Sequence, residues 1–175
     1  AKREGFLIVS TTWIFFSIFG MLPFIIHGCI PNVADAFFET ISGFTTTGAT
    51  VLTDIDSLPH GILFWRCFTQ WLGGMGIILF TLAILPMLNS GGGIQLFNAE
   101  TTGIIHNKLR PRIGQTAKRL WGMYVAITAV LVICLVLGPM DLFDAICHAM
   151  STTATGGYST KQASIAYWNS AYIDY

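Results

Sequence analysis

The chain has 175 residues, of which 53% are hydrophobic and only 10% are charged. An ordinary globular domain is about 25% charged, so this composition excludes a typical soluble domain, and the apolar content excludes a disordered chain. Nine basic residues balance nine acidic ones, which argues against a nucleic-acid-binding protein. The cysteines are too far apart for a zinc or redox motif, so we expect all four to be buried apolar side chains: Cys29, Cys67, Cys134 and Cys147.

Three stretches without a charged residue are long enough to cross a bilayer, at 6–26, 67–88 and 120–140. Core helices of a soluble protein would need charged faces that these stretches lack, and the first is too long for the apolar core of a signal peptide. We place the second span at 62–88, with Arg66 near its outer end, where this cation should pair with an acid or extend toward water. The sequence therefore predicts an all-α integral membrane protein.

A shorter apolar segment lies between the first two spans. Residues 34–44 suit a helix that Asn32 or Asp35 can cap, but eleven residues of helix cover only about 16 Å, half of the bilayer. Residues 45–50 are rich in threonine and favour extended chain. We expect a re-entrant hairpin that lines a path, because irregular backbone at membrane depth must be shielded by protein or face a watery cavity.

The same pattern recurs 109 positions later, with Asp144, Ser151, Thr155 and Gly157 in the places of Asp35, Ser42, Thr46 and Gly48. The two units run in the same direction, unlike the inverted repeats of rocking transporters, so a central pore axis can relate them. This predicts span–pore-helix–filter–span repeats of the potassium-channel kind. We expect a first pore unit at 1–94 (pore helix 34–44, filter 46–50), a cytoplasmic linker at 95–118 and a truncated second unit at 119–175 (pore helix 142–153, filter 155–159).

Both hairpin tips, Thr-Thr-Gly-Ala-Thr at 46–50 and Thr-Gly-Gly-Tyr-Ser at 155–159, resemble the potassium-channel filter Thr-Val-Gly-Tyr-Gly. Glycine adopts positive φ without strain, so successive carbonyls can point the same way, and rings of carbonyls can replace the hydration shell of potassium. Neither tip carries a carboxylate, which argues against a filter of the calcium or sodium type. If only one such tip were present, it could equally be an ordinary turn without a role in ion binding.

The charges are distributed unevenly along the chain. Around the N-terminus and between the second and third spans, basic residues outnumber acidic ones seven to two. The positive-inside rule therefore places the N-terminus and residues 90–119 in the cytoplasm. The opposite side carries seven acids, which either attract cations or only solvate the loops: Asp35, Glu39, Asp54, Asp56, Asp141, Asp144 and Asp174.

Motifs along most of the chain resemble those of the membrane subunits of Trk-type potassium uptake systems, the TrkH family of the Trk/Ktr/HKT superfamily. The resemblance implies potassium transport or symport across a bacterial inner membrane, four pore units around one filter, a homodimer with a pore in each subunit, and a gating partner, a cytoplasmic nucleotide-binding ring. The family usually has Phe in place of Tyr158. The motifs stand at 42–50, 70–77, 84–87, 111–113, 143–148 and 154–160.

The resemblance also implies the site residues. Potassium would be held at Thr46, Thr47, Thr155 and Gly156, with no covalent cofactor. Basic residues of the linker would dock the ring or only anchor the loop on anionic lipid. The full filter would comprise Thr46, Thr47, Gly48, Ala49, Thr155, Gly156, Gly157 and Tyr158, and the docking residues would be Lys108, Arg110 and Arg112.

The length departs from the family pattern, because the chain holds one complete pore unit and most of a second. We therefore expect it to belong to a longer protein or to need partner chains.

Alternative functions are a sodium-permeable transporter of the same superfamily, a non-transporting scaffold, and an intramembrane enzyme. No partner is fixed for Ser42 or Ser151 as a nucleophile, so we do not expect an enzyme. We expect packing or interface roles for seven other residues: Gly73, Gly74, Gly76, His27, His60, His106 and His148.

Overall fold

The computed structural model describes residues 2–89 and 113–174, and all regular secondary structure in these ranges is helical. The all-α class is therefore confirmed. The elements are α1 (Lys2–Gly20), α2 (Leu22–His27), α3 (Val33–Phe44), α4 (His60–Asn89), α6 (Ile113–Leu137), α7 (Leu142–Thr153), the short 3-10 helix η1 (Ser164–Trp168) and α8 (Ala171–Asp174).

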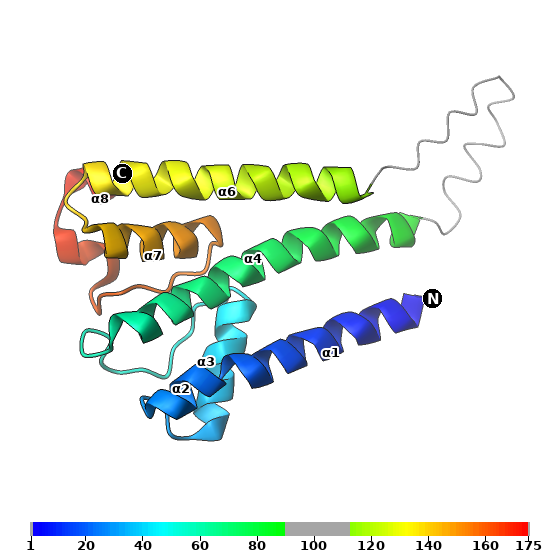
Figure 1. Ribbon diagram of the computed structural model, residues 1–175, viewed down its shortest axis with the longest axis horizontal. Helices are drawn as coiled ribbons and strands as arrows, with labels where there is room; N and C mark the ends of the chain where they lie inside the picture. The colour runs from blue at the N-terminus through cyan, green and yellow to red at the C-terminus, as the bar shows by residue number, and fades with distance from the viewer. Residues whose placement is uncertain (1, 90–112, 175) are drawn as a thin grey trace, which may run out of the picture.

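Three long helices, α1, α4 and α6, run along the length of the molecule, and two short helices pack between them (Figure 1). α3 packs against α1 and α4, and α7 packs against α4 and α6. The beginning of α1, the end of α4 and the beginning of α6 lie at the same end of the molecule (Figure 1). The connections that follow α3 and α7 return between the long helices, so the two halves share one arrangement.

Two segments of the described residues are long and apolar enough to cross a membrane, Ser10–His27 and Thr116–Leu137. The first is not one straight helix, because α1 stops at Gly20 and α2 begins at Leu22. Pro23 explains the break, since its ring would clash with the carbonyl four residues earlier. The span expected at 62–88 falls within α4, whose thirty residues are about 45 Å long.

α6 begins before the span expected at 120–140 and ends three residues short of its end. It ends at Leu137 because Pro139 disfavours helical backbone at the residue before it, and the Gly138 amide then bonds the Leu135 carbonyl at 3.1 Å. Along its length α6 exposes large apolar side chains, among them Ile127, Val130 and Ile133. A helix with such a face suits lipid or further transmembrane helices.

The expectation that all four cysteines are buried is wrong for Cys134, which is exposed on this face of α6, and Cys29 is only partly buried. A thiol is small and apolar enough to be tolerated on such a face. Cys67 and Cys147 are buried as expected, in one cluster with Tyr158.

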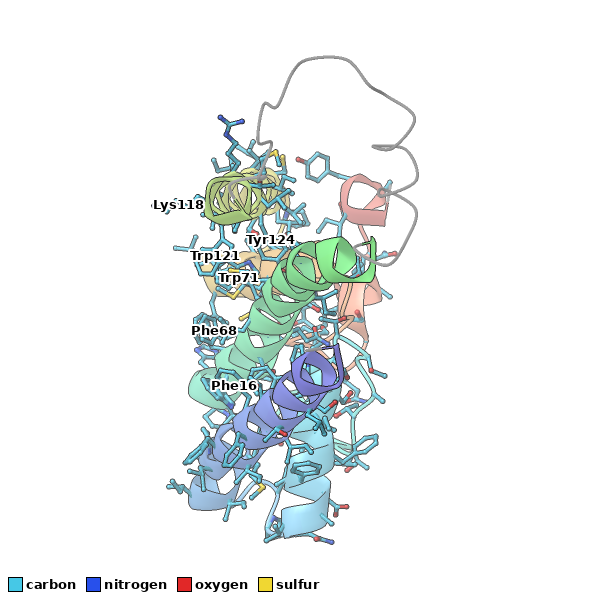
Figure 2. The ribbon with its side chains drawn as sticks, turned by 90° about the vertical axis from the view of Figure 1, so that its right-hand side faces the viewer. Phe16, Phe68, Trp71, Lys118, Trp121 and Tyr124 are labelled. Atoms are coloured by element: carbon cyan, nitrogen blue, oxygen red, sulfur yellow. The ribbon has the colours of Figure 1, made fainter. Side chains whose placement is uncertain are left out.

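Aromatic side chains fill the contact between α4 and α6. Figure 2 shows Trp71 and Tyr124 at this contact, where their ring centroids are 5.6 Å apart. The Tyr124 hydroxyl donates to the Trp71 carbonyl at 3.1 Å, and the Trp71 indole donates to the Thr128 hydroxyl at 3.1 Å. These bonds join the last helix of the first half to the first helix of the second half.

The glycines of α4 allow the pore helices to approach it. A Cβ atom at Gly73 would run into the carbonyl of Phe44, at the end of α3, and one at Gly74 would lie 3.1 Å from Ala154, which caps the end of α7, and 2.6 Å from the Tyr124 hydroxyl of α6. The expectation that the glycines of this helix permit close packing is confirmed at both positions.

Substituting Gly73→Ala should push α3 away from α4, because the added methyl group meets backbone that cannot swing aside. We expect a destabilisation of about 1–3 kcal/mol, as for other overpacked cores. Thermal unfolding of the detergent-solubilised protein measures the loss. Gly122→Ala is the matched control, since a Cβ atom there meets no described atom within 4 Å; equal melting temperatures for the two variants would contradict the prediction.

Candidate functional site

The two pore helices are built alike. α3 and α7 each have twelve residues, and their bounds differ by the 109 positions of the sequence repeat. The Asn32 side chain caps α3 by accepting from the Ala34 amide at 2.9 Å, and the Asp141 side chain caps α7 by accepting from the Phe143 amide at 3.3 Å. Asn32, rather than Asp35, is therefore the cap of the first pore helix.

The chain leaves both helices through the same turn. The Thr47 amide bonds the Ser42 carbonyl at 3.0 Å, and the Gly156 amide bonds the Ser151 carbonyl at 2.9 Å. Thr46 and Thr155 have φ of 56° and 55°, a conformation that a β-branched residue rarely adopts. Such strain persists only where surrounding structure holds it, and it is common at functional sites.

The glycines of the tips serve two needs. Gly48 and Gly157 have φ of 77° and 90°, a conformation that glycine adopts without strain. Gly48 also lies against the other hairpin, because a Cβ atom there would run into the carbonyl of Gly156. The structure thus brings the two predicted filter segments into contact with each other.

The predicted filter residues are not all equally accessible. Thr47, Ala49, Thr155 and Gly157 are exposed, whereas Gly156 and Tyr158 are buried. The carbonyl of Ala49 accepts from the Ser42 hydroxyl at 2.6 Å and from the Tyr158 hydroxyl at 3.2 Å. The Ala49 carbonyl and the Tyr158 side chain are therefore already engaged in bonds within the protein, and the ion-lining role of both stays a prediction.

A buried ion pair lies behind the two tips. Arg66 of α4 and Glu39 of α3 are 1% and 0% exposed, and Nε of Arg66 lies 2.9 Å from Oε1 of Glu39. The expectation that Arg66 pairs with an acid is confirmed. Glu39, which the charge pattern placed on the outer surface, is instead inside the protein, because only there can it meet Arg66.

Arg66 contacts both hairpins. Its Nη2 donates to the Thr50 hydroxyl at 3.2 Å in the first hairpin, and its Nη1 donates to the Ser159 carbonyl at 3.3 Å in the second. Its guanidinium carbon lies 4.2 Å from the centroid of the Tyr158 ring. A single cation on α4 therefore joins the backbone that leaves one predicted filter segment to the backbone that leaves the other.

Glu39 itself holds the first hairpin. Its carboxylate accepts from the Thr50 hydroxyl at 2.9 Å and from the Val51 amide at 3.0 Å. In the second hairpin the equivalent helix position is His148, whose Nε2 lies 3.3 Å from the Ser159 hydroxyl. The repeat of 109 positions already aligns these pairs, so the signal was present in the sequence, but sequence reasoning missed it.

Gln70, one turn after Arg66 on α4, holds the second tip. Its Oε1 accepts from the Ser151 hydroxyl at 2.7 Å and from the Tyr158 amide at 3.1 Å. Its buried Nε2 finds no partner among the described residues. The signal that could have identified Gln70 is its chemistry, since an amide side chain within an apolar span is rare without a function.

Two cavities flank the tips. One of about 260 Å³ lies beside the second tip and is lined by Thr155, Gly156 and Gly157, among others. One of about 500 Å³ includes Asp35 and Asp54 in its lining. Among the described residues no group of histidine, cysteine and acidic side chains could hold a metal ion.

The other candidates fall in different places. His60 stacks on Phe143 with ring centroids 4.3 Å apart, and the buried His148 packs edge-on against Trp168, so both serve packing. His27 is exposed and lines the larger cavity. The predicted docking residues Lys108, Arg110 and Arg112 lie outside the described residues.

Comparison with known proteins adds to this geometry. The family model described as "TrkH: Cation transport protein" matches residues 1–175. The chain is 53% identical to the Trk system potassium uptake protein TrkH of Escherichia coli (strain K12) over 99% of its length and 36% of that protein. It is 40% identical to TrkG of the same organism over 98% of its length, again with 36% of that protein covered.

A solved structure is also similar. The crystal structure of the potassium transporter TrkH from Vibrio parahaemolyticus superposes with a TM-score of 0.81 at 45% identity. The match covers 98% of this chain and 34% of that one. The chain thus spans about a third of the length of the relatives that it matches.

Substituting Arg66→Leu should leave Glu39 charged and unpaired in the interior. Breaking a buried pair on one side costs about 3–5 kcal/mol, whereas removing both charges costs much less. We therefore expect a large fall in the melting temperature of Arg66→Leu and a partial recovery in the double variant with Glu39→Gln.

Lys161→Ala provides the control, because Lys161 lies 3.9 Å from Asp144 in a partly exposed pair, which should contribute at most about 1 kcal/mol. If the double variant melts no higher than Arg66→Leu alone, then the ion pair is not what stabilises this region.

Proposed function

Because this chain belongs to the TrkH family of cation transport proteins, we propose that its two hairpins form part of a potassium-selective path across the membrane. The observation that carries the proposal is the repeated tip, in which Thr46 and Thr155, and Gly48 and Gly157, share the same unusual backbone. Backbone of this kind can aim successive carbonyls toward one axis. The contact between Gly48 and Gly156 supports a common axis for the two tips.

In this proposal, carbonyl and hydroxyl oxygens coordinate the ion. Potassium sheds its water and is held by oxygens of Thr46, Thr47, Thr155 and Gly156, which replace the hydration shell. Two hairpins supply half of a ring of four. The relatives are about three times as long as this chain, so the remaining hairpins come from further residues of the same protein or from partner chains.

Side-chain bonds in the structure argue against the enzyme alternative. The Ser42 hydroxyl donates to the Ala49 carbonyl, and the Ser151 hydroxyl donates to Gln70. Both candidate nucleophiles therefore hold the tips in place. We propose no catalytic residue and no covalent cofactor.

The proposed orientation puts the N-terminus in the cytoplasm of a bacterial inner membrane. The beginning of α1, the end of α4 and the beginning of α6 share one end of the molecule (Figure 1), and the residues flanking these ends are predominantly basic. The cavity lined by Asp35 and Asp54 then faces outward, where its acids raise the local cation concentration.

The assembly is proposed from the family alone. It comprises a homodimer and a cytoplasmic nucleotide-binding ring that gates the pore through Lys108, Arg110 and Arg112. Coupling of potassium entry to a second ion, as in a symporter, belongs to the same proposal.

Substituting Gly48→Ser in the intact protein should lower potassium uptake at least about tenfold and reduce the discrimination against sodium, because the side chain would meet the Gly156 carbonyl and strain a positive φ. Potassium and sodium fluxes into proteoliposomes measure both effects.

Gly28→Ser is the matched control for this experiment. Gly28 has φ of 81°, but a Cβ atom there meets nothing within 4 Å, and the residue lies beyond α2, away from the tips. Equal loss of selectivity in both variants would contradict the filter assignment. A wild-type protein that carries sodium as well as potassium would favour the sodium-permeable alternative.

The orientation has its own test. In a variant without native cysteines, Asp54→Cys should react with a membrane-impermeant maleimide added outside intact cells, and Asn107→Cys should react only after the cells are opened. Labelling in the reverse pattern would show that the charge asymmetry does not set the topology.

A further inference from the structure

One side chain of the second hairpin reaches across to the first. The Tyr158 hydroxyl lies 2.8 Å from the Glu39 carbonyl and 3.2 Å from the Ala49 carbonyl, and donates its proton to these acceptors. The residue is 3% exposed, and its bond to the Glu39 carbonyl is buried, whereas its bond to the Ala49 carbonyl is partly buried. Its backbone amide is held by Gln70 at 3.1 Å, so Tyr158 is fixed at both ends.

The ring of Tyr158 is held by charge as well. The guanidinium of Arg66 lies over its face, 4.2 Å from the centroid, and the same guanidinium pairs with Glu39 of the first hairpin. A cation over an aromatic face is attracted more strongly when both groups are desolvated, as here. The ring orientation, and with it the position of the hydroxyl, is therefore determined by residues outside the second hairpin.

The first hairpin supplies no equivalent side chain that reaches the second hairpin. The repeat places Ala49 in the position of Tyr158, and the methyl group of alanine cannot reach back. The Ala49 carbonyl accepts from Tyr158 and also from Ser42 at 2.6 Å, so both of its lone pairs are occupied. The Ala49 carbonyl belongs to the peptide plane next to the one that carries the Gly48 carbonyl, so fixing it restricts the backbone rotations between the two planes.

We propose that in this chain, where Tyr158 replaces the Phe usual in the family, the tyrosine hydroxyl is a specificity-determining, positioning group: it orients the Ala49 carbonyl of the first filter from the second hairpin. The inference rests on the proposed potassium path and names the interaction that tunes it. The hydroxyl does not touch the ion; it acts through the Ala49 carbonyl and the adjoining Gly48 peptide.

Tyr158→Phe is the direct test, since it removes one oxygen and leaves the ring under Arg66. In the intact protein reconstituted in vesicles, we expect the ratio of potassium to sodium flux to fall by about three- to tenfold, the size of one lost hydrogen bond, without loss of folded protein. Ser42→Ala removes the other donor to the same carbonyl and should shift the ratio in the same direction. A purely structural tyrosine would lower the amount of active protein and leave the ratio unchanged.

Tyr167→Phe is the matched control. Tyr167 is exposed, and loss of its hydroxyl should leave the flux ratio at the wild-type value. A selective wild-type protein with an unchanged ratio in both Tyr158→Phe and Ser42→Ala would overturn this inference and leave the proposed path intact. A wild-type protein without preference for potassium would overturn the proposed path, and this inference with it.

Discussion

The arrangement of the site depends on one buried ion pair. Glu39 and Arg66 are both removed from water, and an unpaired charge at either position would be strongly unfavourable in the interior. The pair is tolerable because each side chain also makes further hydrogen bonds, to Thr50, Val51 and Ser159. Those further bonds are made to both hairpins. The hydrogen bonds that the buried pair requires therefore also hold the two hairpins in position.

Sequence reasoning succeeded where local chemistry determines the structure. Asn32 was one of the two caps expected for the first half-length helix, and α3 and α7 lie at Val33–Phe44 and Leu142–Thr153, close to the ranges expected at 34–44 and 142–153. It failed where depth in the protein matters. From the sequence, the Glu39 carboxylate was interpreted as a charge on the outer surface. Only the packing of α3 against α4 shows that it pairs with Arg66. The positive φ of Thr46 and Thr155 was missed for a related reason, since β-branched residues keep such backbone only where surrounding structure holds it. The break at Met21 was missed although Pro23 is a local signal for it.

The two repeats share a backbone but have diverged in the side chains behind it. Position 39 is glutamate in the first hairpin and its equivalent, His148, is an imidazole. Position 49 is alanine, whereas its equivalent, Tyr158, carries the hydroxyl that crosses between the hairpins. In a filter built from four identical chains, every side-chain contact is repeated four times by symmetry. Repeats within one chain can differ in sequence, so a contact between two of them can occur only once, as it does for the arginine that bonds both hairpins.

The ion pair also bears on how a carbonyl filter can work next to a buried carboxylate. Conduction needs a site that binds an ion well enough to admit it and weakly enough to release it. An uncompensated charge on Glu39 would attract a cation over several ångströms in a medium of low dielectric constant, and would favour tight binding of any cation. Arg66 cancels that charge at 2.9 Å, so the proposed path is left with the dipoles of carbonyls and hydroxyls. Selectivity then depends on how accurately those dipoles are held, which is why hydroxyl, amide and guanidinium groups are concentrated directly behind the tips.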